Sequence, residues 1–239
     1  MCEQAAPATN VPPPLESRTG RAWTSGRPGL SRRLPALGLV LLTGCASITH
    51  VRPVPRGALV AEASVGGPFA LVSGIPVPLP LTSVGATYGL RERLSVHGHV
   101  QPSPLMFGAL GGDVGATGLL LEEQGARPAL AASGQVNVLT DFRTASWWSA
   151  DASLTASWLL GERWMPYVTT TGQLDFLNQL FHVAPGVGAQ VLLDRWTLQA
   201  EARLYAPTRR SDIAALPYVG IGGRGAFGLV LGAGYRFGL

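Results

Sequence analysis

Apolar and polar residues alternate with a period of two along most of the chain after residue 56. Between Leu94 and Gln101 the even positions are apolar or glycine, and the odd positions carry serine, histidine and glutamine. The same alternation runs through 145–159 and 196–205. A period of two places successive side chains on opposite faces of a strand. The pattern therefore predicts strands with one apolar and one polar face.

Repeated along the chain, this alternation predicts ten strands. Most have close to the roughly 9–11 residues that a tilted strand needs to cross a bilayer. The predicted strands are 57–66, 83–91, 93–101, 109–121, 127–138, 146–159, 164–174, 181–192, 195–205 and 218–238.

The connections between the predicted strands alternate in length. Short turns at 91–93, 122–127, 161–163 and 193–195 alternate with five longer connections, of which 67–82 is the longest. Outer-membrane barrels have short periplasmic turns and longer outside loops. Both ends of an even-stranded barrel lie on the short-turn side, so the N-terminus and short turns are expected in the periplasm.

The composition favours a barrel over helices that span a membrane. Only 13% of residues are charged and 46% are hydrophobic, yet no run of 18 apolar residues occurs. A closed barrel hides its apolar content by alternation, since every backbone group pairs between strands. The fold class predicted is all-β: an antiparallel up-and-down transmembrane β-barrel of about ten strands, with eight or twelve as alternatives.

A short export signal precedes the barrel. Arg32 and Arg33 lie before an apolar core at 34–42, and residues 42–45 read Leu-Thr-Gly-Cys. This segment resembles the bacterial lipobox, which implies a diacylglyceryl group on Cys45 and handling by the lipoprotein-sorting machinery. The expected organisation is a disordered extension or misassigned start at 1–30, a signal peptide at 31–44, a lipidated linker at 45–56 and the barrel at 57–239.

The end of the chain gives a second resemblance. Residues 232–239 place aromatic or apolar residues at alternate positions after glycine, similar to the terminal signal read by the barrel-assembly machinery, although Leu239 replaces the usual final aromatic residue. Together with the lipobox, the chain resembles small outer-membrane β-barrel proteins of Gram-negative bacteria. The resemblance implies contact with outer-membrane lipid and a bacterial outer-membrane location.

Charge excludes a nucleic-acid partner. The formal net charge is +4, but five arginines precede Cys45, and the remaining chain is almost neutral. Binding to nucleic acid needs positive charge clustered on one face, and the predicted mature portion has no such cluster.

Charged residues on the polar faces are expected to line the barrel lumen and pair there, because an unpaired buried charge is unfavourable. The favoured interpretation is a structural network that fills a small barrel. The residues expected in it are Glu62, Arg91, His97, His99, Asp113, Asp151, Glu201 and Arg203.

Two of these histidines form the sharpest local feature. His97 and His99 share a strand face about 7 Å apart, and Asp113 is expected across from His97 on the next strand. Two imidazoles with a carboxylate can bind zinc or copper. The alternative is that water and Asp113 satisfy both histidines, and no cofactor or metal is predicted.

Several functions remain open at this stage. The preferred expectation is a structural, adhesive or small-solute passage role without catalysis. A lipid-tethered periplasmic barrel that binds an apolar ligand is one alternative. An enzyme acting on lipid at the barrel rim is another, for which His182 is the only suitably placed histidine, and no Gly-x-Ser-x-Gly element accompanies it. The apolar, proline-rich loop at 69–81 is expected to fold into the barrel mouth, pack on the membrane or meet a partner.

Overall fold

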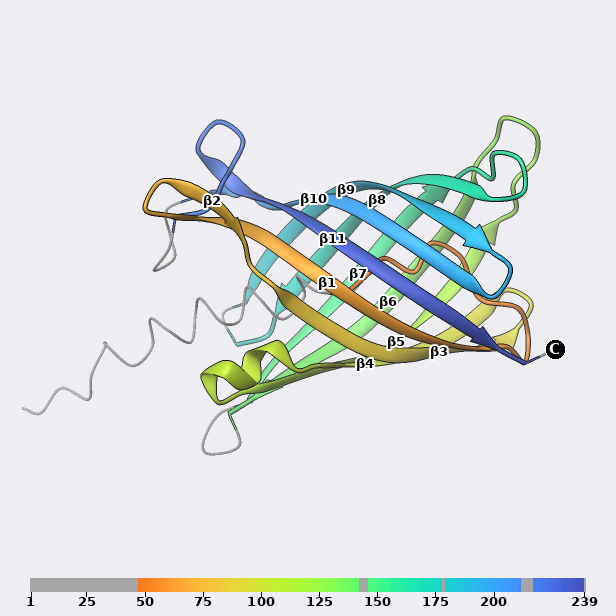
Figure 1. The fold of residues 1–239 in the computed structure, drawn as a ribbon, viewed down its shortest axis with the longest axis horizontal. Coiled ribbons are helices and arrows are strands. Elements are labelled where there is room, and N and C mark those ends of the chain that lie inside the picture. The colour runs from red at the N-terminus through yellow and green to blue at the C-terminus, as the bar shows by residue number, and fades with distance from the viewer. Residues whose placement is uncertain (1–46, 142–145, 178, 212–216, 239) are drawn as a thin grey trace, which may run out of the picture.

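The structure is a single β-barrel (Figure 1). This computed structural model describes residues 47–141, 146–177, 179–211 and 217–238. The strands in these ranges are β1 (Leu59–Val72), β2 (Ile75–Pro78), β3 (Leu81–Arg91), β4 (Leu94–Gln101), β5 (Leu110–Leu121), β6 (Ala129–Thr140), β7 (Ser146–Ser157), β8 (Trp164–Asp175), β9 (Leu180–Leu193), β10 (Trp196–Arg210) and β11 (Arg224–Phe237).

The barrel wall closes through β1. From β3 to β11 each strand pairs antiparallel with its neighbours in sequence, and β1 pairs with both β3 and β11. The wall thus has ten strands, because β2 contacts only the outer part of β1. The predicted up-and-down barrel of ten strands is confirmed, and the predicted strand positions agree with the wall to within a few residues, except at the ends of β1, β10 and β11.

The prediction that 69–81 is a loop is wrong. β1 continues to Val72 and forms a hairpin with β2, which stands away from the barrel rim (Figure 1). Ser73 and Gly74 connect the strands with φ values of 52° and 81°, as a two-residue hairpin turn requires. β-branched and aromatic residues on both sides favour strand over loop.

The two ends of the barrel differ. Turns of two to seven residues after β3, β5, β7 and β9 lie at the same end as the start of β1 and the end of β11, here named the short-turn end. The opposite, long-loop end carries the β1–β2 hairpin and the short 3-10 helix η2 (Ser103–Phe107) between β4 and β5.

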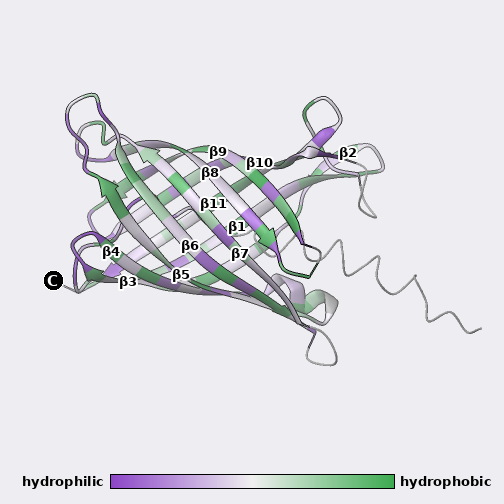
Figure 2. Cartoon of the chain, turned by 180° about the vertical axis from the view of Figure 1, so that it is seen from behind, coloured by the Kyte–Doolittle hydropathy of each residue, from purple (hydrophilic) through white to green (hydrophobic). Residues whose placement is uncertain are grey.

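The two faces of the wall are opposite in character. Outward side chains such as Val114, Val187 and Leu231 are 58–64% exposed. Inward side chains are mostly polar and buried, including Thr87, Thr117 and Asn137. Figure 2 shows apolar and polar residues alternating along the wall strands. An apolar outside around a polar inside is the arrangement of a transmembrane β-barrel.

Aromatic residues mark both edges of the apolar band. Trp164 and Trp196, near the short-turn end, are 57% and 51% exposed, and Trp148 near the long-loop end is 52% exposed. Tryptophans at these levels are typical of the two membrane interfaces. None of the helices in the described ranges is long and apolar enough to cross a membrane.

Candidate functional site

Residues 47–55 occupy the lumen, where the sequence predicts only a linker outside the barrel. This segment, named the plug, meets the wall at the short-turn end, where Ala58 N donates to Pro55 O and Gly57 N to Gly89 O. From there it continues inward, and Ser47, Thr49, His50 and Val51 are all buried. Figure 1 shows the segment running between the walls.

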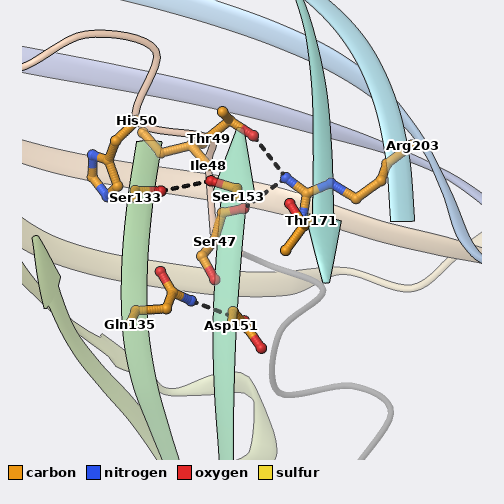
Figure 3. Close-up of a pocket in the computed structure, with 10 residues that line it drawn as sticks. All are labelled: Ser47, Ile48, Thr49, His50, Ser133, Gln135, Asp151, Ser153, Thr171 and Arg203. Atoms are coloured by element: carbon orange, nitrogen blue, oxygen red, sulfur yellow. Dashed lines mark hydrogen bonds between the residues drawn. The ribbon is translucent and has the colours of Figure 1, made fainter. Parts of the chain in front are cut away.

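Arg203 and Gln199 of β10 hold the inner part of the plug. Arg203 Nη2 donates to Thr49 Oγ1 at 3.1 Å, and Gln199 Nε2 donates to Thr49 O at 3.1 Å. Arg203 also reaches Ser47 O at 3.5 Å. Figure 3 shows the guanidinium turned toward Thr49 and Ser47. Since buried backbone carbonyls need partners, these contacts specify the plug path.

Arg52 holds the outer part of the plug. Its Nε donates to Ser157 Oγ at 2.8 Å and its Nη2 to Glu123 Oε2 at 2.7 Å. Glu123, in the turn between β5 and β6, also accepts from Leu159 N. The hydrogen bond from Arg52, followed by that from the Leu159 backbone, lowers the pKa of the Glu123 carboxyl below its ordinary value.

A buried network on β8 and β10 supports these contacts. Arg203 Nε donates to Glu201 Oε1 at 2.8 Å, and Tyr167 Oη donates to Glu201 Oε2 at 2.8 Å. Gln199 Nε2 donates in turn to Tyr167 Oη at 2.7 Å. Val51 of the plug packs against Tyr167 and Met165. Each buried polar atom named here is thus satisfied while the plug is in place.

The wall opposite Arg203 leaves little space beside the plug. Ser133 Oγ lies 2.6 Å from Ser153 Oγ, and Gln135 Nε2 donates to Asp151 Oδ2 at 3.2 Å (Figure 3). The cavity between these residues and Ser47 is about 30 Å³, room for about two waters. A larger cavity of about 540 Å³ opens on the short-turn side of the plug and extends to Glu62 and His50.

His50 of the plug meets two histidines and two carboxylates of the wall. His99 Nδ1 lies 2.8 Å from Asp113 Oδ1, and His99 Nε2 lies 3.1 Å from Glu62 Oε2. His50 stacks on His97 with ring centroids 3.8 Å apart, and its Nδ1 is 3.9 Å from Glu62 Oε2. His50, Glu62 and His99 offer ligand atoms that all lie within 4.8 Å of one another.

Glycine makes room for this cluster. Gly85 is paired with His99 and Gly115 with His97 across the strands. A Cβ added at Gly85 would lie 2.3 Å from His99 Cδ2, and one at Gly115 would lie 2.5 Å from His97 Nε2. Larger residues at these positions would displace the imidazoles.

Most of the residues predicted to line the lumen do so. Glu62, His97, His99, Asp113, Asp151, Glu201 and Arg203 all lie in the lumen. Arg91 lies on the lumen-facing side of β3, but it is exposed beside the short turn that follows, away from this network. The expected pairing of Asp113 with His97 is wrong by two residues: Asp113 faces His99, and His97 faces Gly115. Cys45 lies outside the described residues.

Sequence reasoning missed the plug residues. His50 and Arg52 belong to a short segment between the expected lipid site and the first strand, with Pro53 and Pro55 interrupting any period. The available signal was the presence of two polar, titratable side chains in a segment expected to be only a tether.

No protein-family model matches the chain, and no curated protein sequence matches it. One similar solved structure is an outer membrane channel from Pseudomonas putida F1, with 11% identity, coverage of 80% of this chain and 99% of that chain, and a TM-score of 0.45. A second is the translocator domain of the autotransporter NalP from Neisseria meningitidis, with 12% identity, coverage of 87% and 94%, and a TM-score of 0.41. A third is the attachment invasion locus protein Ail of Yersinia pestis, with 11% identity, coverage of 76% and 99%, and a TM-score of 0.26.

These likenesses concern architecture alone, because the identities and scores are too low to relate functions. The closed wall, its apolar outside and its polar lumen carry the assignment by themselves. The chain is an outer-membrane β-barrel.

Proposed function

We propose that this protein is a closed outer-membrane barrel with a structural or adhesive role, without catalysis, whose lumen is filled by its own residues 47–55. The observation that carries the proposal is the attachment of the plug at two levels, by Arg203 and Gln199 inside and by Glu123 and Ser157 near the short-turn end. A solute would have to displace this segment to pass.

The proposed orientation places the short-turn end in the periplasm and the long loops outside. It is supported by the difference in connection length, since bacterial barrels have short periplasmic turns. The β1–β2 hairpin then projects from the cell surface, with Ile75 65% exposed, and Met106 of η2, elsewhere at the same end, is 80% exposed. Apolar side chains in this position suit an adhesive surface.

Single-channel recording in planar bilayers tests whether the plug closes the barrel. The wild-type protein should give no stable current steps, and a variant lacking residues 47–54 should give them. A variant in which Thr49 and Arg52 are both replaced by alanine should show intermittent steps, because the plug keeps its length but loses polar contacts at both levels. Steady wild-type conductance unchanged by the deletion would contradict the proposal.

The resemblance of residues 42–45 to a lipobox favours a second candidate, a lipid-anchored barrel open to small solutes. Ser47, the second residue after the predicted lipid site Cys45, is buried in the lumen. A lipid at the short-turn rim would draw this end of the chain toward the membrane, out of the contacts that Ser47 and Thr49 make with Arg203. In this second candidate, lipid attachment therefore competes with the plugged state.

Mass spectrometry of the mature N-terminus, combined with the recordings, separates the two candidates. A chain without diacylglycerol on Cys45 that conducts no current supports the plugged barrel. A diacylated Cys45 together with stable current steps supports the lipid-anchored passage. In that case residues 47–55 do not close the lumen of the mature protein.

A further inference from the structure

We infer that His50, Glu62 and His99 bind a divalent late transition metal, with Zn²⁺ or Cu²⁺ as the chemical class, and that the ion ties the plug to the barrel wall. The inference rests on the proposed plug, because His50 belongs to that segment, whereas Glu62 and His99 belong to β1 and β4.

The distances fit a compact coordination sphere. With bonds of about 2.0–2.1 Å, ligand atoms around a tetrahedral zinc lie about 3.4 Å apart. Glu62 Oε2 is 3.1 Å from His99 Nε2 and 3.9 Å from His50 Nδ1. All three ligand atoms lie within 4.8 Å of one another, so modest side-chain rotations would bring them around one ion.

Asp113 orients His99 for this role. It lies 2.8 Å from His99 Nδ1, which leaves Nε2 directed at Glu62. A carboxylate that accepts from the second nitrogen of a ligating histidine fixes the ring and its tautomer. Gln101 Nε2 donates to the other oxygen of Asp113 at 3.3 Å, and Thr87 Oγ1 donates to Glu62 Oε2 at 2.8 Å. Both carboxylates are therefore held in place.

The charge in the cluster favours a cation. Glu62 and Asp113 contribute two carboxylates, and in the described residues their contacts are with histidine, threonine and glutamine, with no arginine among them. The two acids thus share a single strongly hydrogen-bonded imidazole, His99. A divalent ion between His99 Nε2 and Glu62 would balance both carboxylates.

Neighbouring imidazole nitrogens also lack protein partners. His50 Nε2 and both nitrogens of His97 are buried without a hydrogen-bond partner in the described part of the chain. Buried polar nitrogens normally have partners, and an ion or ordered water is a common explanation when protein offers none. His97 stacks on His50 and would supply a fourth ligand after a turn of its ring.

An ion can reach the cluster from the short-turn end. The cavity of about 540 Å³ there is lined by both His50 and Glu62. The donor set also selects the metal: imidazole with one carboxylate suits zinc, copper and nickel, whereas calcium and magnesium prefer oxygen alone. The site is therefore expected to ignore Ca²⁺ and Mg²⁺.

The test is metal binding by the refolded full chain, prepared without a histidine tag. Zn²⁺ and Cu²⁺ are titrated by calorimetry, the bound metal is counted by elemental mass spectrometry, and Mg²⁺ serves as the negative probe. Wild type should bind one ion per chain. His50→Ala and Glu62→Gln should each weaken the Kd at least about tenfold, and Asp113→Asn about 10–100-fold.

The chain supplies its own control. His182 is the fourth histidine and lies on β9, outside the cluster, so His182→Ala should leave the Kd unchanged. His50→Ala changes only the plug and keeps the wall intact, and a heat-modifiability gel checks that each variant is folded.

No binding of Zn²⁺ or Cu²⁺ by the folded wild type, or equal loss in His182→Ala and His50→Ala, would overturn the inference. Single-channel conductance tests separately whether the plug closes the barrel. A silent barrel that binds no metal contradicts only the metal site, whereas a wild-type barrel that conducts steadily contradicts the proposed function first.

Discussion

At the scale of single residues, small side chains and paired charges decide how the lumen is packed. Gly188 of β9 lies beside Tyr167, and a Cβ added there would be 2.4 Å from Tyr167 Oη and 2.6 Å from Ala200 O. The added methyl group would clash with both atoms. The sheet holds the backbone oxygen in place, and the phenol of Tyr167 would have to shift. Tyr167 in turn contacts Glu201, Gln199 and the plug residue Val51.

Gly188→Ala should therefore destabilise the barrel by about 1–3 kcal/mol, the usual range for overpacking. The free energy of unfolding in urea with lipid vesicles measures this. Gly134→Ala is the matched control, because its Cβ would meet only Asp151 O at 3.8 Å. Equal stability of the two variants would contradict the packing described for Tyr167.

The Glu201–Arg203 pair gives a second prediction. Both side chains are buried and lie 2.7 Å apart. Arg203→Ala leaves the Glu201 charge without its ion-pair partner, which should destabilise the barrel by about 3–5 kcal/mol. Adding Glu201→Gln should recover part of that loss, because the uncompensated charge is removed. A double variant that is no more stable than Arg203→Ala alone would argue against a coupled pair.

Much of this site follows from the alternation in the sequence. Glu62, His97, His99, Glu201 and Arg203 lie in the lumen, where the alternation places them, because one face of a strand must be polar when the other meets lipid. The partner of Asp113 is His99, two residues along the strand from the expected His97, because the connection that contains η2 sets the register between β4 and β5 and the alternation alone does not. The place of His50 in the lumen could not be predicted, because a nine-residue segment with two prolines has no hydrophobic period.

At the scale of elements, the plug depends on a turn outside the membrane. Arg52 is paired with Glu123, and both side chains are 23% exposed. Because the pKa of Glu123 is lowered in the folded protein, the pair contributes fully above the ordinary glutamate range. The contribution of the pair to stability is lost as the pH falls through the lowered pKa of Glu123.

Between pH 7 and pH 3 the wild type should therefore lose slightly more stability than Glu123→Gln, by about 0–1 kcal/mol as for other accessible ion pairs. Urea unfolding at both pH values measures the difference. Glu122→Gln is a suitable comparison, because its pair with Arg93 joins side chains that are 57% and 61% exposed. It should follow the wild type at both pH values.

At the scale of the whole molecule, the lipid-facing surface should be sensitive to charge according to depth. Val114 lies near the middle of β5 and is 64% exposed on the outside. Val114→Arg should destabilise the barrel by about 2–4 kcal/mol, as arginine does at the bilayer midplane. Leu90, at the end of β3, is 45% exposed, and Leu90→Arg should lose about 0–1 kcal/mol.

Unfolding titrations in lipid vesicles measure both free energies. Equal losses at the two depths would be incompatible with a wall that spans a bilayer. They would instead fit a barrel surrounded by uniform solvent.

The hairpin that extends beyond the rim has a consequence for how copies of this protein meet. Val72 pairs with Ile75 beside the turn, and Ala70 pairs with Val77, so the backbone of Ile75 and Val77 faces β1. The backbone nitrogens of Pro76 and Pro78 face away from it and carry no hydrogen. An incoming strand would find no donor along this margin. The protein can thus display apolar side chains beyond the barrel rim without offering an edge for the strand-to-strand pairing that leads to fibrils.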